Sequence, residues 1–338
     1  MRIADRIHIT KRSGASGKAM ALTRIAAIVI ALLASGLVML CMGYNPLEVY
    51  KRIVTASLSS YSRFGETINK TILLTMLSLG ISVAFRMKFW NIGAEGQLYM
   101  GAFGAALIAF GFPELPAGVL LPLMGLAGFV FGGLWAIIPA LIKLKFSTSE
   151  TLVTLMMNYI AISFISYLEY GPWKDPASLG AAKIAQFSDN AVLPKVFGIH
   201  AGWIITLVIV VIMTIVMKYS KLGYQIDVLG ESETTARYAG MNTLKITLVA
   251  VVLSGGLCGV GGFMQASAIE RSITDQMSGG LGFTAVITAW LAKLKPPVIV
   301  IVSFAFSMLL QGVIIFFVLG SEFFINYRIS FRKTEKEG

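Results

Sequence analysis

Charged residues are scarce in this chain of 338 residues. Asp, Glu, Lys and Arg together make up 13% of it, whereas 56% of it is hydrophobic. Because a soluble domain usually has about 25% charged residues, this composition excludes an ordinary soluble enzyme or binding module. It predicts an all-α, polytopic helical membrane protein. The formal net charge of +11 is then no sign of nucleic-acid binding, since basic residues of membrane proteins gather in cytoplasmic loops.

Histidine and cysteine are rarer still, with two of each. Cys41 and Cys258 lie in apolar segments, and His8 and His200 lie outside them. No spacing typical of a metal site or a disulfide framework is present, and no nucleophile–base pair is visible. We therefore expect no metal, no cofactor and no catalytic residues. The segment from Gly14 to Lys18 lacks the Walker spacing of a nucleotide-binding loop.

Apolar runs predict the membrane topology. Residues 1–24 are basic and polar and should be cytoplasmic, and the run 25–43 should be an uncleaved first span. Further spans are expected over 68–85, 98–112, 118–141, 146–168, 203–217, 246–266 and 298–319. The run 283–292 is too short to cross about 30 Å of hydrocarbon, which indicates a broken or re-entrant helix.

These runs define the expected organisation. A membrane domain should cover 25–327, with about 8–10 transmembrane segments. It should carry a long external loop at about 171–202 and a cytoplasmic segment at about 218–245, and a basic tail should follow at 328–338.

The stretch from Phe85 to Gly101 is polar and interrupted by glycines, although it lies between two apolar runs. Backbone that leaves the helix at membrane depth is tolerated only where protein buries it or where it lines an aqueous cavity. The two basic residues of this stretch fit ordinary cytoplasmic anchors. For Asn91, Glu95 and Gln97 we favour a role in a transport pathway or in a structural kink.

A second polar pattern lies in the run 146–168. Glu150, Thr154 and Asn158 are spaced at i, i+4 and i+8, so they share one face of a helix. A polar face of a span should point into the bundle, because polar groups in lipid cost several kcal/mol unless they are paired. Two interpretations stay open here, namely a helix that lines a pathway and hydrogen bonding between helices.

The segment 230–241 mixes charged, small and apolar side chains and is too polar to span. Lys218, Lys221 and Lys245 flank it, which places it on the cytoplasmic side. A short helix of this composition suits the groove of a partner protein. A solvated loop helix is the alternative.

Three stretches together resemble a known family. Asn-Ile-Gly-Ala-Glu-Gly-Gln (91–97), Glu-Thr-Leu-Val-Thr-Leu-Met-Met-Asn-Tyr (150–159) and the segment 230–241 resemble signatures of permease subunits of ATP-binding-cassette (ABC) importers. The branch is the one for nucleosides, ribose and other simple sugars, which is related to branched-chain amino-acid permeases. The resemblance covers about 44–328 of the chain.

The resemblance implies a multi-pass transport subunit of the cell membrane that moves substrate by alternating access. It implies that ATP hydrolysis occurs on a separate subunit, so that this chain is not itself an enzyme. The substrate pathway would include Asn91, Glu95, Gln97, Glu150, Thr154 and Asn158. Contact with the ATPase would involve Gly230, Glu231, Ala236, Arg237, Ala239 and Gly240.

The partners implied are a cytoplasmic ABC ATPase, a second permease (identical or homologous) and an extracytoplasmic substrate-binding lipoprotein that docks at 171–202. Membrane lipid completes the set, and nucleic acid is not expected. Nucleosides are the first expectation for the substrate, with ribose or another simple sugar as the alternative. A secondary transporter or channel is the alternative of a different class. The chain departs from the family near Leu310, where about twenty residues of a polar turn and further span would be expected.

Overall fold

A computed structural model describes residues 45–310, apart from 177 and 179–181, together with a few positions between 33 and 40. The chain divides into two compact units, one made of 1–56 with 312–338 and the other of 57–311. In the first unit the main described element is α2 (Pro46–Leu58). The expectations for the N-terminal segment, the first span and the C-terminal tail concern residues outside the described part.

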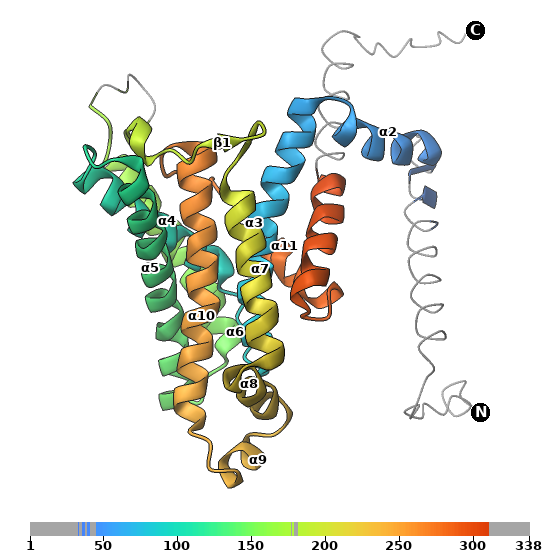
Figure 1. Ribbon diagram of the computed structural model, residues 1–338, viewed down its shortest axis with the longest axis vertical. Coiled ribbons are helices and arrows are strands. Elements are labelled where there is room, and N and C mark those ends of the chain that lie inside the picture. Colours follow the sequence, from blue (N-terminus) through green and yellow to red (C-terminus); the bar gives the residue numbers. More distant parts are fainter. Residues whose placement is uncertain are drawn as a thin grey trace, which may run out of the picture. The chain divides into compact units, whose positions relative to one another are not determined.

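The second unit is a bundle of helices (Figure 1). Its long members are α3 (Tyr61–Arg86), α4 (Ala94–Gly111), α5 (Ala117–Phe146), α6 (Glu150–Tyr170), α7 (Gly202–Tyr219) and α10 (Thr243–Met264). Shorter helices are α8 (Lys221–Glu231), α9 (Glu233–Tyr238), α11 (Leu281–Leu291) and a helix at Pro296–Leu310. In the described residues the only strands are β1 (Lys195–Val196) and β2 (Ile199–His200), which pair in the segment between α6 and α7. The all-α expectation is confirmed.

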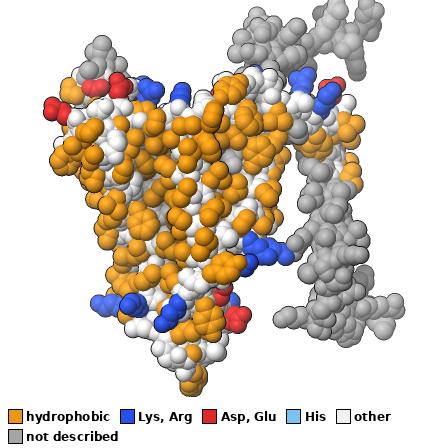
Figure 2. Space-filling view, viewed as in Figure 1, with side chains coloured by type: hydrophobic (Ala, Val, Ile, Leu, Met, Phe, Trp, Pro, Cys, Tyr) orange, Lys and Arg blue, Asp and Glu red, His pale blue; other side chains and the backbone are white. Residues whose placement is uncertain are grey.

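Five described helices are long and apolar enough to cross a membrane: α3, α5, α6, α7 and α10 with its continuation to Glu270. Figure 2 shows a wide hydrophobic flank with charged side chains gathered towards its two ends. This confirms a polytopic helical membrane protein. The helices extend a few residues beyond the apolar runs because polar end groups continue the hydrogen-bond ladder. Ser60, for example, caps α3 by accepting a hydrogen bond from Arg63 N at 3.4 Å.

Glycines bring the central helices into backbone contact. A side-chain carbon at Gly132 of α5 would collide with the carbonyl oxygen of Gly255 in α10. A side-chain carbon at Gly101 of α4 would collide with the backbone of Gly259. Small residues therefore let α4, α5 and α10 approach closely, as expected for helices that pack in lipid.

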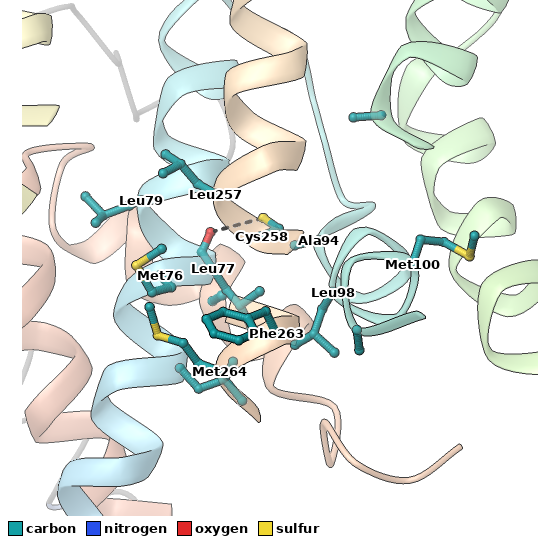
Figure 3. Close-up of a cluster of buried hydrophobic side chains, with 14 of the residues drawn as sticks. Met76, Leu77, Leu79, Ala94, Leu98, Met100, Leu257, Cys258, Phe263 and Met264 are labelled. Atoms are coloured by element: carbon teal, nitrogen blue, oxygen red, sulfur yellow. Dashed lines mark hydrogen bonds between the residues drawn. The ribbon is translucent and has the colours of Figure 1, made fainter. Parts of the chain in front are cut away.

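Apolar side chains fill the spaces beside these glycines (Figure 3). Leu77 from α3, Leu98 from α4 and Phe263 from α10 belong to one buried cluster. The thiol of Cys258 donates a weak hydrogen bond to the carbonyl oxygen of Leu77 at 3.8 Å. Close packing of this kind makes α3, α4 and α10 the rigid centre against which the polar segments lie.

The chain breaks after α10, as the short apolar run predicted. α10 continues as a π-helical segment, Gln265–Glu270, and the next ten residues, 271–280, are not helical. α11 then has 11 residues, about 16 Å at 1.5 Å per residue, which is too short to cross the bilayer. This broken arrangement is typical of transporter cores.

Candidate functional site

The interruption between α3 and α4, residues 87–93, is held by an amide pair. Asn91 and Gln97 are buried, and each donates to the other's side-chain oxygen, at 3.1 and 3.0 Å. The amide nitrogen of Asn91 also donates to Ser254 Oγ in α10 at 3.0 Å, and its oxygen accepts from Gly93 N at 3.0 Å. The pair therefore fixes the interruption to α10 and to the start of α4.

The polar face of α6 holds the same interruption from the other side. Asn158 Oδ1 accepts from Gly96 N at 2.8 Å, and Asn158 Nδ2 donates to Ile92 O at 2.9 Å. Thr154 Oγ1 accepts from Ile92 N at 3.2 Å. Both α6 side chains are fully buried. The shared face predicted from their spacing is present and points at backbone groups that have left the helical ladder.

Glu150 completes this face at the start of α6. One of its oxygens accepts from Trp90 N at 3.4 Å and forms an ion pair with Lys143 Nζ at 2.7 Å. All three residues on α6 thus contact the interruption, Glu150 at Trp90 and the other two at Ile92. Sequence spacing alone could not pair Lys143 with Glu150, because it does not show that α5 ends beside the start of α6.

Glu95 lies inside α4 rather than in a loop, and only 2% of it is exposed. One carboxylate oxygen accepts from Gly282 N at 2.7 Å, and the other is hydrogen-bonded to Ser278 Oγ. Gly282 lies in the first turn of α11, where free N–H groups and the helix dipole favour a negative charge. Glu95 therefore caps α11. Sequence reasoning did not find Ser278, which is 183 residues away along the chain.

α8 packs on the end of α3. A side-chain carbon at Gly230 would collide with the carbonyl oxygen of Arg86. Arg86 pairs with Asp227 at 3.4 Å, and Lys88 Nζ donates to Glu231 O at 3.5 Å. Burial raises the pKa of Asp227, although Arg86 acts in the opposite direction. The two basic residues expected as membrane anchors are thus also the contacts between α8 and the interruption.

α9 is the outermost helix at this end of the bundle (Figure 1). Ser232 separates it from α8 and caps it by accepting from Thr235 N at 3.2 Å. The segment 230–241 therefore contains the end of α8 and the whole of the short helix α9. Of the six predicted contact residues, the structure buries Gly230 and Ala236 and exposes Glu231, Arg237, Ala239 and Gly240.

A cavity of about 280 Å³ lies between these parts. It is lined by the interruption, the end of α5, α8, α9 and the start of α10, through residues that include Met87, Lys143, Leu229, Arg237 and Leu244. This end of the bundle thus offers a recess beside an exposed short helix. In the part of the chain that the structure describes, no group of three or more His, Cys, Asp or Glu is placed to hold a metal ion.

The chain is similar in sequence to permease proteins of several ABC transporters. The chain is 28% identical to the glucose ABC transporter permease protein TsgB13 of Haloferax volcanii, over 91% of this chain and 89% of that protein. It is 28% identical to the nucleoside ABC transporter permease protein NupB of Lactococcus lactis, over 86% and 83%. It is 30% identical to the guanosine ABC transporter permease protein NupP of Bacillus subtilis, over 80% and 79%.

Among solved structures there is no match to the chain. The family model of the branched-chain amino acid transport system permease component matches residues 64–325. That range contains the interruption, the polar face of α6, and α8 with α9. The chain is therefore a multi-pass membrane protein that belongs to the family of branched-chain amino acid transport system permease components.

Proposed function

We propose that this chain is the membrane subunit of an ATP-driven importer and that its substrate is a nucleoside. The observation that carries the substrate class is the likeness to permeases named for nucleosides and guanosine, which extends over most of both chains. Glucose or another simple sugar is the second candidate, favoured by the likeness to a glucose permease over 91% of this chain.

The proposed energy source is ATP hydrolysis on a separate cytoplasmic ABC ATPase that binds α8 and α9. The exposed positions of Arg237, Ala239 and Gly240 beside a recess of about 280 Å³ support this contact. Tyr238 supports it further, because 93% of this aromatic residue is exposed. An exposed aromatic side chain next to charged residues is typical of a protein contact.

The contacts of α8 explain how a push on α9 would reach the membrane part. Gly230 touches the end of α3, and Arg86 and Lys88 bind Asp227 and Glu231. Residues 87–93 follow directly, and their backbone is bonded to α6. We propose that Asn91, Glu95, Gln97, Glu150, Thr154 and Asn158 act in the pathway by positioning this movable segment.

A second permease subunit, identical or homologous, and an extracytoplasmic binding lipoprotein complete the proposed importer. The external segment 171–202, with its β1–β2 hairpin, is the proposed dock for the lipoprotein. A secondary transporter is less well supported. Glu95 and Glu150 are its strongest candidates for the ion-coupling carboxylate, but the first caps α11 and the second pairs with Lys143.

The test replaces Ala239 and Gly240 with bulky residues in the assembled importer. We expect the permease to insert while ATPase binding or substrate-stimulated ATP hydrolysis fails. Normal transport and normal stimulation in a correctly inserted variant would show that the contact is elsewhere. Binding of guanosine, but not of glucose or ribose, to the partner lipoprotein tests the substrate class.

A further inference from the structure

The non-helical segment 271–280 runs back into the bundle after α10. The hydroxyl of Tyr99 donates to the carbonyl oxygen of Asp275 at 2.6 Å, and Ser166 Oγ donates to the carboxylate of Asp275 at 2.8 Å. Tyr99 lies in the second turn of α4, and Ser166 lies in α6, eight residues after Asn158. Residues 275–278 therefore lie within the bundle beside α4 and α6, whereas Ser272 bonds residues 184 and 185 of the segment after α6.

On one side of this segment the polar groups are hydrogen-bonded by other parts of the protein, whereas the other side is exposed. Gln265 Nε2 donates to the carbonyl oxygen of Met277 at 2.8 Å, and Ser278 bonds to Glu95. In contrast, Gln276 and Gly279 are exposed, and a side-chain carbon at Gly279 or Gly280 would meet no atom within 4 Å. Irregular backbone with an open side at membrane depth faces either an aqueous cavity or another protein, because lipid cannot satisfy its polar groups.

The hydrogen bond of Ser166 to Asp275 joins α6 to this segment. Tyr159 and Ser163 precede Ser166 by seven and three residues, so all three lie on neighbouring faces of α6. Tyr159 is 61% exposed and Ser163 is also exposed. A tyrosine near a helix end suits the membrane interface, but Tyr159 is the tenth of the 21 residues of α6. Its position in the middle of a span favours contact with water or substrate rather than lipid.

We propose that Tyr159, Ser163, Gln276 and Phe283 form the substrate-binding surface of the translocation pathway, with a nucleoside as the ligand. Phe283 is 37% exposed in the first turn of α11, directly after the open segment. Aromatic rings stack on nucleobases of every kind. The amide of Gln276 offers both a donor and an acceptor for the base or the ribose.

This surface rests on the proposed nucleoside function and deepens it. Its two α6 residues, Tyr159 and Ser163, lie on the side of the helix away from Thr154 and Asn158. The side chains of Thr154 and Asn158 already bond backbone groups. The buried polar face is then the support, and the exposed face touches the substrate.

Thiol labelling in membrane vesicles that contain the complete importer tests the surface. Ser163→Cys and Gln276→Cys are compared with Leu126→Cys on α5, which is 60% exposed, in a background with Cys41→Ser. We expect a charged methanethiosulfonate reagent to label the first two at least tenfold faster than the third. Guanosine should slow this labelling, whereas ribose should not.

Equally slow labelling at all three positions would overturn the surface, because it would place Ser163 and Gln276 against lipid. Fast labelling that guanosine and ribose both leave unchanged would also overturn it, since water alone would then fill the space. Protection by ribose alone would uphold the surface and overturn the nucleoside as substrate. As a second measurement, Phe283→Ala should raise the KM for guanosine uptake about tenfold, whereas Phe283→Tyr should keep it within about twofold.

Discussion

The side chain of Asn158 bonds the backbone on both sides of the start of α4, through Gly96 N at 2.8 Å and Ile92 O at 2.9 Å. One amide thereby satisfies a donor and an acceptor that the helical ladder does not reach. Such a contact explains why a polar residue occupies a fully buried position in a membrane helix.

Asn158→Leu should therefore impair uptake more than expression. It leaves a buried N–H and a buried C=O without partners, at a cost of about 1–3 kcal/mol each. Measured substrate uptake per inserted protein should fall at least several-fold, while Leu126→Ile on the exposed side of α5 serves as the control. An Asn158→Leu protein that fails to insert, or that transports normally, would favour a pure packing role or no role.

Gly230→Ala should uncouple α8 from the membrane part. The added carbon collides with the carbonyl oxygen of Arg86, so α8 must move away from the end of α3. Substrate-stimulated ATP hydrolysis should drop while basal hydrolysis stays. Gly118→Ala in α5 is the matched control, because a side-chain carbon there meets no atom within 4 Å. Unchanged stimulation of ATP hydrolysis by substrate would mean that the displacement of α8 from α3 does not affect coupling.

Replacement by alanine should lower stability at one glycine of α10 and leave it nearly unchanged at another. At Gly259 the added carbon collides with the carbonyl oxygen of Gly128, whereas at Gly261 the nearest atoms are side-chain carbons at 3.4 Å. Gly259→Ala should lower stability by about 1–3 kcal/mol, as overpacking does, and Gly261→Ala should leave it nearly unchanged. Melting temperatures in detergent compare the two. Equal melting temperatures would contradict the close backbone contact of α5 and α10.

Acid should lower the stability of the β1–β2 hairpin, because His200 is buried in β2. Burial lowers the pKa of this imidazole to about 4, and its Nδ1 accepts a hydrogen bond from Gly202 N at 3.2 Å. The unfolded chain takes up this proton near pH 6.5 and the folded chain only near pH 4, so the unfolded state binds more protons between these values. Stability present above pH 6.5 is thus lost as the pH falls towards 4, by about 3 kcal/mol at most.

The difference between the wild-type chain and His200→Gln isolates this effect from the titration of carboxylates. Glutamine keeps a side-chain acceptor for Gly202 N but does not titrate in this range. The melting temperature of the variant should fall less between pH 6.5 and 4 than that of the wild-type chain. Parallel curves would show that His200 is protonated in the folded state as readily as in the unfolded state.

Much of the membrane fold follows from the sequence because transfer into lipid depends on the local composition of a segment. The apolar runs predicted α3, α5, α6, α7 and α10 to within a few residues at most ends. The helical period likewise placed Glu150, Thr154 and Asn158 on one face, since that depends only on 3.6 residues per turn. The glycines after α10 together with the shortness of the next apolar run predicted a broken helix.

What the polar residues bind was decided only by the tertiary structure. The sequence placed Glu95 in a polar stretch between helices. In the structure it lies in α4 and caps α11 through its bonds to Gly282 and Ser278. Gly230 read as part of a contact segment, but it packs against Arg86. These partners lie between about 140 and 190 residues apart in sequence. No local period encodes such pairs, because they exist only once the packed helices have fixed the relative heights and directions of the side chains.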